Sequence, residues 1–259
     1  MGFERFKPKK SLGQNFLIDH NIAKKIVRSL SLKPSDIVLE IGAGKGMLTQ
    51  YLLPVVNTLY AIEIDQGLIS LLNEKFSSTS HFHLIHADFL KIDLRSLVSN
   101  NLKIRVVGNI PYNISSQVIF KVIENRQYFS DMTLMLQREL GKRIVADPNI
   151  KDYGILSVIC QAHAQVKPVF EIPKTVFFPI PKVDSIVIKW DFSQSLATQI
   201  VDKDIFRTIV RTAFGQRRKM LRNSLKDYIN TDDRLSVYLE KRPEQLAIRE
   251  WIEFVNILV

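Results

Sequence analysis

A glycine-rich turn that joins an apolar stretch to a helical pattern constrains the fold of this chain more than any other feature. Residues 37–41 read Ile-Val-Leu-Glu-Ile, residues 42–46 read Gly-Ala-Gly-Lys-Gly, and a helical pattern follows over residues 47–53. Short apolar stretches and helical patterns go on alternating after it. This alternation predicts a parallel α/β sheet with right-handed crossovers.

The predicted elements fall into two groups along the chain. Strands are expected over residues 37–41, 59–64, 82–86, 104–108 and 132–137, and helices over residues 21–30, 47–53, 68–76 and 114–123. A late strand is expected over residues 183–190, with Val183, Ser185, Val187 and Lys189 on one face. Only helical patterns follow from about residue 193. We therefore expect two domains, residues 1–192 and a helical domain of residues 193–259.

Length and composition limit the class of protein. The chain has 259 residues, 46% of them hydrophobic, which is enough for a sizeable core and a small appendage. It contains no run of about 18 apolar residues, so no membrane span is indicated. Its first eight residues lack the apolar stretch of a signal peptide. These points predict a cytoplasmic protein.

A metal site is not expected. Cys160 is the only cysteine, which excludes an intrachain disulfide and a cysteine-built metal site. His81 and His83 share a face of their predicted strand, but His86 falls on the other face. Because no cysteine completes a ligand set, these histidines do not predict a zinc ion.

Three predicted strands end in groups suited to an adenosine-type cofactor. In an open α/β sheet, ligands lie beyond the carboxyl ends of the strands, near the point where strand order reverses. Glycines there let the backbone pass close under a ligand. Glu63 ends the second strand and can accept both hydroxyls of a ribose, and Asp88 after the third can accept a hydrogen bond from an adenine amino group. A helix-capping role is the alternative for Asp88.

Two phosphate-binding motifs are similar to the glycine-rich turn, but neither fits it. A Walker loop requires Ser or Thr directly after its lysine, whereas Gly46 follows Lys45. A dinucleotide fingerprint requires Gly-x-Gly-x-x-Gly/Ala, whereas the spacing here is Gly-x-Gly-x-Gly. This spacing disfavours a nicotinamide oxidoreductase. A structural turn that binds no cofactor is the other interpretation of the motif by itself.

The tetrapeptide Asn109-Ile110-Pro111-Tyr112 follows the fourth predicted strand and is therefore expected beside the cofactor. The side-chain carbonyl of Asn109 and the backbone carbonyl of Ile110 can accept the two N–H bonds of an exocyclic amine on a base. Such contacts would localise a nitrogen lone pair that is otherwise delocalised into the ring. Tyr112 offers a face on which an extruded base can stack. An ordinary proline turn with a packed tyrosine is the alternative.

Phe177 is the candidate for the second face of that base. It lies in a proline-flanked segment, residues 176–183, which reads Val-Phe-Phe-Pro-Ile-Pro-Lys-Val. The alternative is that Phe177 or Phe178 simply belongs to the core, as an isolated phenylalanine usually does.

Together these motifs resemble the ribosomal RNA adenine N6-dimethyltransferase family over nearly the whole chain. The similar segments are residues 9–17, 40–46, 63–65, 109–112, 137–139 and 177–185, together with Asp88. Residues 214–226 are similar to the branch that acts on small-subunit ribosomal RNA. A sister branch of the family methylates large-subunit RNA.

The resemblance implies a Rossmann-like class I S-adenosylmethionine methyltransferase fold with a small all-helical C-terminal domain. It implies S-adenosylmethionine contacts at Asn15, Leu17, Gly42, Glu63, Asp88 and Asn109, and catalytic roles for Asn109, Tyr112 and Phe177. It further implies dimethylation of two adjacent adenines near the 3′ end of 16S ribosomal RNA, linked to maturation of the 30S subunit. A non-catalytic RNA-binding or assembly factor is the alternative, although the Asn-x-Pro-Tyr motif is intact. We expect a monomer.

The net charge of +10 is clustered, which is typical of a protein with a polyanionic partner. The N-terminal basic cluster comprises Arg5, Lys7, Lys9, Lys10, Lys24, Lys25, Arg28 and Lys33. The C-terminal basic segment, residues 205–226, contains Arg207, Arg211, Arg217, Arg218, Lys219, Arg222 and Lys226 and no acid. Arg218, Arg222 and Lys226 recur every four residues and predict one stripe of a helix. We interpret both clusters as contacts to RNA phosphates, with a solvated charged face as the alternative.

Overall fold

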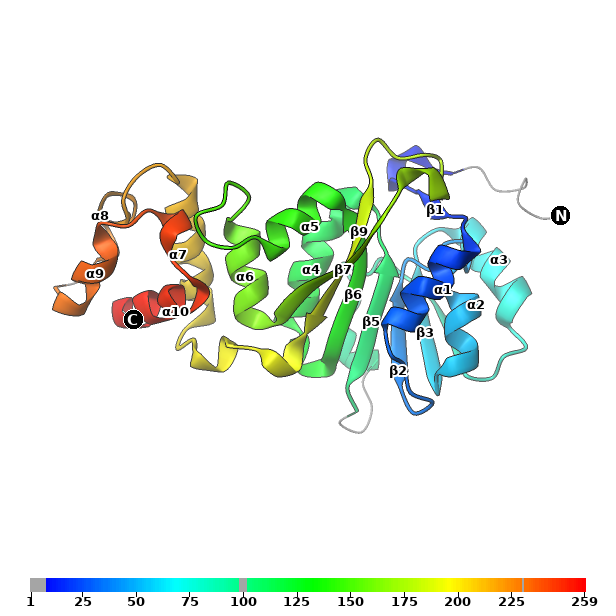
Figure 1. Ribbon diagram of the computed structural model, residues 1–259. Coiled ribbons are helices and arrows are strands. Elements are labelled where there is room, and N and C mark those ends of the chain that lie inside the picture. The colour runs from blue at the N-terminus through cyan, green and yellow to red at the C-terminus, as the bar shows by residue number, and fades with distance from the viewer. Residues whose placement is uncertain (1–7, 98–101, 230) are drawn as a thin grey trace. The chain divides into compact units, whose positions relative to one another are not determined.

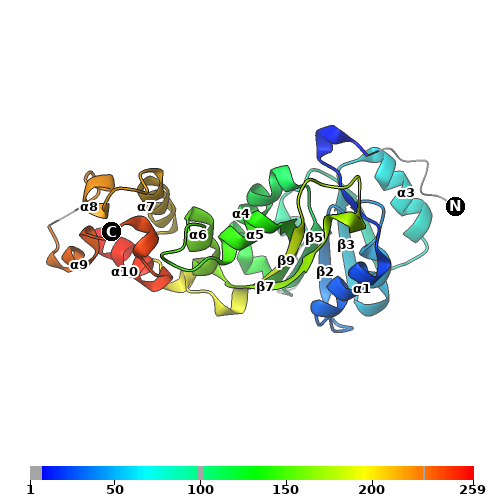
Figure 2. The same ribbon diagram turned by 45° about the horizontal axis from the view of Figure 1, so that its top comes forward.

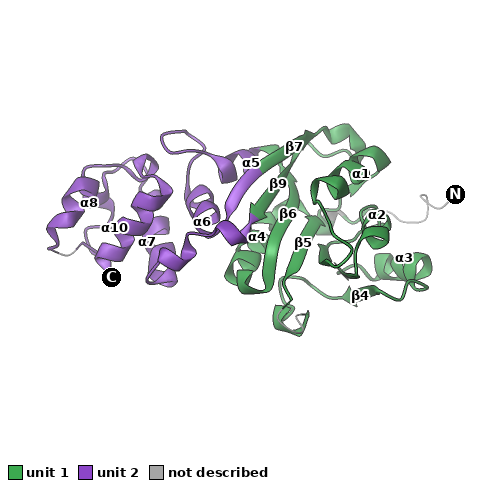
Figure 3. Cartoon of the chain, turned by 60° about the horizontal axis from the view of Figure 1, so that its bottom comes forward, with its two compact units in different colours: residues 1–138, 168–190 green, residues 139–167, 191–259 purple. Residues whose placement is uncertain are grey.

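The computed structural model describes residues 8–97, 102–229 and 231–259. The chain divides into two compact units, residues 1–138 with 168–190 and residues 139–167 with 191–259 (Figure 3). The domain boundary expected at residue 192 stays a prediction. The compact units differ from it in grouping residues 139–167 with the C-terminal helices.

A seven-stranded sheet forms the centre of the first unit in the described part of the chain (Figure 1). Its strands are β2 (Ile37–Ile41), β3 (Thr58–Glu63), β4 (Phe82–His86), β5 (Ile104–Asn109), β6 (Phe129–Gln137), β7 (Gln165–Ile172) and β9 (Ser185–Asp191). Their order is β4-β3-β2-β5-β6-β9-β7, and neighbours among β2 to β6 pair in parallel. The predicted parallel α/β sheet is confirmed for these five strands. Strand order reverses between β2 and β5.

β9 runs antiparallel to β6, so the sheet is not purely parallel. The backbone N–H of Arg138, directly after β6, donates to the carbonyl of Asp184, directly before β9. At the other end, Lys189 of β9 pairs with Asp131 near the start of β6. This direction brings the first residue of β9 to the carboxyl ends of the parallel strands.

Helices cover both faces of the sheet. They are α1 (His20–Ser29), α2 (Thr49–Leu52), α3 (Gln66–Phe76) and α4 (Ser115–Glu124). α1 and α2 pack with Val38, Val107 and Val187 in one core cluster. α4 connects β5 to β6, and a right-handed crossover places it on the opposite face. Asp19 and Asp65 start α1 and α3 by accepting backbone N–H bonds of the first turn.

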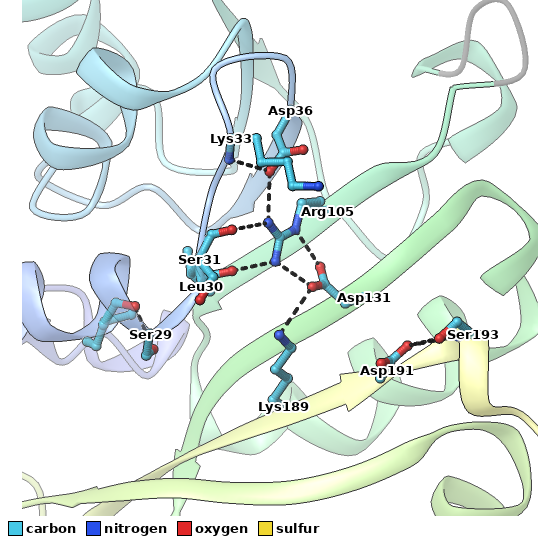
Figure 4. Close-up of polar contacts among 11 residues, drawn as sticks. Ser29, Leu30, Ser31, Lys33, Asp36, Arg105, Asp131, Lys189, Asp191 and Ser193 are labelled. Carbon is cyan, nitrogen blue, oxygen red and sulfur yellow. Dashed lines mark hydrogen bonds and ion pairs between the residues drawn. The ribbon is translucent and has the colours of Figure 1, made fainter.

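A largely buried ion-pair network joins the amino-terminal ends of the central strands (Figure 4). Arg105 in β5 donates from Nε to Oδ1 of Asp131 at 3.0 Å and from Nη1 to Oδ2 of Asp36, before β2, at 2.8 Å. Its guanidinium also donates to the two carbonyls that follow α1. Lys189 adds a pair with Asp131 at 3.6 Å. The Arg105 side chain is 15% exposed. Its guanidinium therefore connects the end of α1 with the starts of β2, β5 and β6.

A two-stranded antiparallel sheet, β1 (Phe16–Leu17) with β8 (Phe177–Phe178), was outside the predicted elements. Each strand has only two residues, which is too short for a period of two to stand out in a sequence. The pairing brings two segments together that lie far apart in the chain.

The second unit is helical. Its helices are α5 (Arg138–Val145), α6 (Ile155–His163), α7 (Lys203–Gly215), α8 (Leu221–Ser224), α9 (Ser236–Leu239) and α10 (Ile248–Leu258). α6, α7 and α10 contact one another, which is why residues 139–167 belong to this unit, and Figure 2 shows α7 to α10 gathered in one group. Phe206, Trp251 and Phe254 are fully buried in it. In the part of the chain that is described, no helix combines the length and apolar character needed to cross a membrane.

The predicted single helix through Arg218, Arg222 and Lys226 is wrong. α7 ends at Gly215, and α8 has only four residues, so Arg218 lies in the turn before it and Lys226 in the turn after it. Leu221 is buried, and its backbone N–H donates to the carbonyl of Lys241. This contact with a distant segment replaces the helical hydrogen bond that a longer helix would have made.

Arg105→Ala should lower the free energy of unfolding by about 3–5 kcal/mol, because it leaves two largely buried carboxylates and two carbonyls without their donor. Urea unfolding measures this loss. Hydrogen bonds to Lys33 and Arg105 outweigh burial and lower the pKa of Asp36, so its contribution should persist above its ordinary pKa and disappear as pH falls through the lowered value. Arg95→Ala, in an exposed pair with Asp93, is the control and should leave stability unchanged. Equal effects of the two variants would contradict the role of the network.

Candidate active site

A cavity of about 290 Å³ lies at the carboxyl ends of β2, β3 and β5, where strand order reverses. Its wall consists of residues 11–17, 40–45, 62–64, 87–90 and 109–114, with a few neighbours. Ligands of open α/β sheets bind at this place. Seven of the predicted site residues lie in the wall, namely Asn15, Leu17, Gly42, Glu63, Asp88, Asn109 and Tyr112.

The glycine-rich turn adopts a backbone that other residues rarely reach. Gly42 and Gly44 have φ angles of +71° and +59°, in the left-handed region that favours glycine. A Cβ atom on Gly44 would also approach the ring of Phe16 to 3.3 Å. The turn can therefore present bare backbone to the cavity.

Glu63 is held in place entirely by backbone groups. Its Oε1 accepts hydrogen bonds from the N–H groups of Ile64 and Asp65 at 2.8 and 2.9 Å, and its Oε2 accepts from Gly44 at 2.9 Å. A carboxylate has about four acceptor sites, so one remains for a ligand hydroxyl. The bond to Gly44 also ties the carboxylate to the glycine-rich turn.

Asp88 makes a local capping bond and also lies in the cavity wall, and its contact with an adenine amino group stays a prediction. Its Oδ1 accepts the backbone N–H of Leu90 at 2.9 Å, which is a local turn-capping bond. The residue also lines the cavity, and its side chain is 30% exposed. The capping bond orients the carboxylate without using its whole accepting capacity.

The amide of Asn109 is oriented by the N-terminal segment. Its Nδ2 donates to the backbone carbonyl of Asn15 at 3.1 Å. The side chain of Asn15 in turn donates to the carbonyl of Gly13 at 3.2 Å. With its nitrogen committed, Asn109 keeps its carbonyl oxygen as the acceptor for a ligand.

Tyr112 is anchored at both ends of its side chain. Its ring lines the cavity, and its hydroxyl makes a hydrogen bond of 2.7 Å with the hydroxyl of Ser185. Burial raises the pKa of Tyr112, so the phenol is neutral at physiological pH. The ring is available as an apolar surface rather than as a base.

The structure does not bring Phe177 to the cavity. Its ring is 1% exposed and belongs to the core cluster that also contains Leu17. Phe177 pairs with Leu17 and Phe178 pairs with Phe16, and both Leu17 and Phe16 line the cavity. Directly opposite residues share a face and successive residues alternate, so Phe178, 52% exposed, lies on the side of Phe16. A stacking role for Phe177 stays a prediction, and its placement here matches the core alternative.

The segment before β1 is tied to the sheet by Asp65. Oδ1 of Asp65 pairs with Nζ of Lys9 at 2.9 Å, and Oδ2 accepts from Nε2 of Gln14 at 3.1 Å. Burial raises the pKa of Asp65, but the hydrogen bonds from Lys9 and Gln14 outweigh it and the pKa is lowered overall. Sequence reasoning missed this tether, although an Asp directly before a helix is a recognisable cap. Arg5 and Lys7 of the N-terminal basic cluster lie outside the described residues.

Glu40, at the end of β2, is a buried acid that sequence reasoning did not single out. It is 1% exposed, and its Oε2 accepts the Thr49 hydroxyl at 2.6 Å. Burial raises the pKa of its carboxyl to about 8, with a further rise from Glu63 and an opposing effect of the Thr49 hydrogen bonds. Glu40 is therefore largely neutral near pH 7.

The C-terminal basic segment has both exposed and structural members. Arg218 and Lys226 are exposed. Arg222 pairs with Glu240, so an acid from another segment partly neutralises the stripe. Arg217 donates to the carbonyls of residues 150 and 151 and thereby holds a loop of its own unit.

No cluster of three or more His, Cys, Asp or Glu side chains is placed to hold a metal ion within residues 8–97, 102–229 and 231–259. The three histidines of the third strand region have other contacts. His81 and His86 each bond a backbone carbonyl, and His83 stacks on Tyr60.

The chain matches a family model and curated proteins over nearly its whole length. The family model described as ribosomal RNA adenine dimethylase matches residues 5–258. The chain is 42% identical to the ribosomal RNA small subunit methyltransferase A of Francisella tularensis subsp. novicida, over 97% of this chain and 98% of that protein. It is 44% identical to the protein of the same name from Chlorobium phaeobacteroides, over 94% and 91% of the two chains.

Solved structures support the same fold. A dimethyladenosine transferase from Plasmodium falciparum superposes with a TM-score of 0.79 at 26% identity, covering 92% of this chain and 95% of the other. The 23S rRNA methyltransferase ErmE superposes with a TM-score of 0.71 at 23% identity, covering 94% and 99%. The second likeness concerns the fold alone. The expected Rossmann-like methyltransferase fold with C-terminal helices is confirmed.

Glu40→Gln should remove a pH dependence of stability. The folded-state pKa of Glu40 is raised from 4.5 to about 8, so the stability it contributes is fully present below pH 4.5 and is lost as pH rises through about 8. We expect the free energy of unfolding of the wild type to fall, by up to about 1.4 kcal/mol per pH unit, relative to Glu40→Gln over that range. Urea unfolding between pH 5 and pH 9 measures it. Glu74→Gln, at an exposed position of α3, is the control, and parallel profiles of Glu40→Gln and wild type would contradict the assignment.

Proposed function

This chain belongs to the ribosomal RNA adenine dimethylase family, and on that premise we propose that it dimethylates the N6 amine of two adjacent adenines near the 3′ end of 16S ribosomal RNA during 30S maturation. The names of the curated relatives support the small subunit as the source of the RNA. The observation that carries the proposal is the cavity in which Glu63, Asn109 and Tyr112 meet. S-adenosylmethionine is the methyl donor of this family.

The polar groups and the bare glycine backbone of the cavity suit S-adenosylmethionine. Gly42 and Gly44 leave space that a Cβ atom would fill, and bare backbone there can approach a ligand closely. Glu63 would accept a hydrogen bond from one ribose hydroxyl at its remaining acceptor site, and Asp88 would accept a hydrogen bond from the amino group of the adenine ring. Asn15, Leu17 and Asn109 would complete the contacts from the other side of the cavity. When bound, the cofactor supplies an electrophilic methyl group.

Asn109 and Ile110 prepare the target amine. An exocyclic amine of adenine is a weak nucleophile because its lone pair is delocalised into the ring. Oδ1 of Asn109, left free by the bond from Nδ2 to Asn15, accepts one N–H, and the carbonyl of Ile110 accepts the other. Both contacts favour a tetrahedral nitrogen with a localised lone pair. Asn109 removes no proton, and the rate gain comes from orientation.

Tyr112 holds the base that is turned out of the RNA. Stacking of one base on an aromatic side chain contributes about 1–3 kcal/mol. Its phenol is neutral because burial raises its pKa, so the ring binds the base without competing for its protons. Phe177 remains the family's candidate for the opposite face, and it would have to leave the core cluster to serve there.

The helical part of the chain is assigned to RNA binding. Residues 1–192 would carry cofactor binding and methyl transfer, and residues 193–259 would bind RNA. Arg218 and Lys226 are exposed, which supports direct contact with phosphates. Arg222 would contact a phosphate while keeping its ion pair with Glu240.

The chain acts as a monomer in the cytoplasm in this proposal. Within the described residues, every residue that lines the cavity comes from the first unit, so the proposed reaction uses no residue of a second copy. The partner is ribosomal RNA, either free or in the precursor of the small subunit.

Asn109→Ala should lower kcat for methyl transfer by about 100- to 1,000-fold, the loss typical for removal of one preorganised polar partner of the reacting atoms. Incorporation of tritiated methyl groups into unmethylated small subunits and into naked 16S RNA measures it and compares the two substrates. Asn73→Ala, at an exposed position of α3, is the matched control and should retain full activity. Undiminished turnover of Asn109→Ala would overturn its role. Wild-type protein that binds the cofactor but transfers nothing would instead indicate an assembly factor.

The double variant Arg218→Ala/Lys226→Ala should weaken RNA binding and flatten its salt dependence. Removing one side chain that neutralises a phosphate should reduce the slope of log affinity against log salt by about 0.7–0.9. Fluorescence anisotropy with labelled RNA over a range of salt concentrations measures the slope. Arg234→Ala is the control, because Arg234 is exposed but bonded to Asp232. An unchanged slope in the double variant would mean that these residues form only a solvated charged face.

A further inference from the structure

A hydrogen bond between two hydroxyl groups lies directly behind the candidate active site. The Tyr112 hydroxyl and the Ser185 hydroxyl are 2.7 Å apart, although the residues are 73 positions apart in the chain. Ser185 is fully buried, whereas Tyr112 is partly exposed and lines the cavity. The proposed methyl transfer uses the ring of Tyr112, and Ser185 has no role in it so far.

The backbone around Ser185 is fixed on both sides. Ser185 is the first residue of β9, and the preceding carbonyl, of Asp184, accepts the N–H of Arg138 at the end of β6. The side chain of Asp184 accepts the N–H of Lys174 at 3.0 Å. Two residues further along the same face, Val187 is packed in the core. Ser185 therefore offers its hydroxyl from a position that cannot move easily.

A tyrosine ring attached only at its Cα can swing about two side-chain torsions. Tyr112 begins in a turn directly after Pro111, and its far end is bonded to Ser185. Holding both ends fixes the direction of the long axis of the ring, and the preference of the phenolic O–H to lie in the ring plane restrains rotation about that axis. Stacking requires the ring to lie parallel to the base, and a surface that is oriented before binding avoids the entropy cost of ordering it afterwards.

We propose that Ser185 is a positioning residue that holds the Tyr112 ring in place for stacking of the target adenine. The inference rests on the proposed function, because it assigns the ring to base stacking. Ser185 touches neither base nor cofactor and acts through Tyr112. The simpler alternative is that Ser185 is a buried hydroxyl that, like most buried polar groups, makes a hydrogen bond, and that Tyr112 is its partner without consequence for catalysis.

The kinetic test compares Ser185→Ala, Tyr112→Phe and the double variant. Both single variants remove the same hydrogen bond, and Tyr112→Phe keeps the ring. We expect each to lower kcat about 3- to 10-fold, the range of one net hydrogen bond. KM for RNA should hardly change, because phosphate contacts dominate affinity. The double variant should be no slower than either single variant, because the same bond can be removed only once. Effects that multiply would overturn the proposal.

A second measurement needs no turnover. An RNA hairpin with 2-aminopurine in place of the target adenine loses fluorescence when that base stacks on an aromatic ring. We expect strong quenching at saturating wild-type protein and clearly weaker quenching with Ser185→Ala and Tyr112→Phe. Unchanged quenching in both variants would overturn the proposal. If wild-type protein transfers no methyl group, the proposed function fails, while quenching still reports on the ring.

Ser157→Ala is the matched control for loss of a buried serine hydroxyl. Ser157 is also fully buried, but it bonds to the carbonyl of Arg143 in the second unit. It should lower the melting temperature without changing kcat or quenching. If Ser185→Ala does not fold, Tyr112→Phe tests the proposal by itself. The hydroxyl that this variant removes belongs to Tyr112, the partly exposed member of the pair. Normal kcat and normal quenching in Tyr112→Phe would then contradict the proposal.

Discussion

The parallel pairing of β2 with β5 is the constraint on which the rest of the first unit depends. Its register sets Ile41 opposite Gly108, so the glycine-rich turn and the Asn109 tetrapeptide begin side by side. A Cβ atom on Gly108 would approach the Ile41 carbonyl oxygen to 2.7 Å, so this close pairing requires glycine. The helices that follow the two strands lie on opposite faces, and the cavity forms between their starting points.

The residues that stabilise the sheet and the residues that line or support the cavity lie at opposite ends of the same strands. Arg105 at one end of β5 gathers carboxylates and carbonyls, while Asn109 at the other end faces the cavity. β9 repeats this division, with Lys189 in the ion-pair network and Ser185 behind Tyr112. Because the members of each pair lie four residues apart, near opposite ends of one strand, a rigid sheet can carry both functions without conflict.

Three polar side chains of the cavity are each oriented by hydrogen bonds to other parts of the protein. Glu63 is held by three backbone N–H groups, Asn109 by the carbonyl of Asn15, and Tyr112 by Ser185. Preorganised groups of this kind stabilise a transition state without the cost of reorientation. A cluster of basic residues does not by itself identify the side chains that bind RNA. Lys9 already forms an ion pair with Asp65, and Arg222 already forms one with Glu240.

Apolar periodicity and turn residues are local signals, and they predicted the five parallel strands, the glycine-rich turn and the cavity residues Glu63, Asp88, Asn109 and Tyr112. Asn15 and Leu17 followed only from the family resemblance. Long-range contacts determine that Phe177 is buried while Phe178 is exposed, that β9 runs antiparallel, and that α8 begins only at Leu221. These outcomes depend on Leu17, Arg138 and Lys241, which lie far away in the chain. Contacts between distant residues leave no periodic pattern, so local sequence could not predict them.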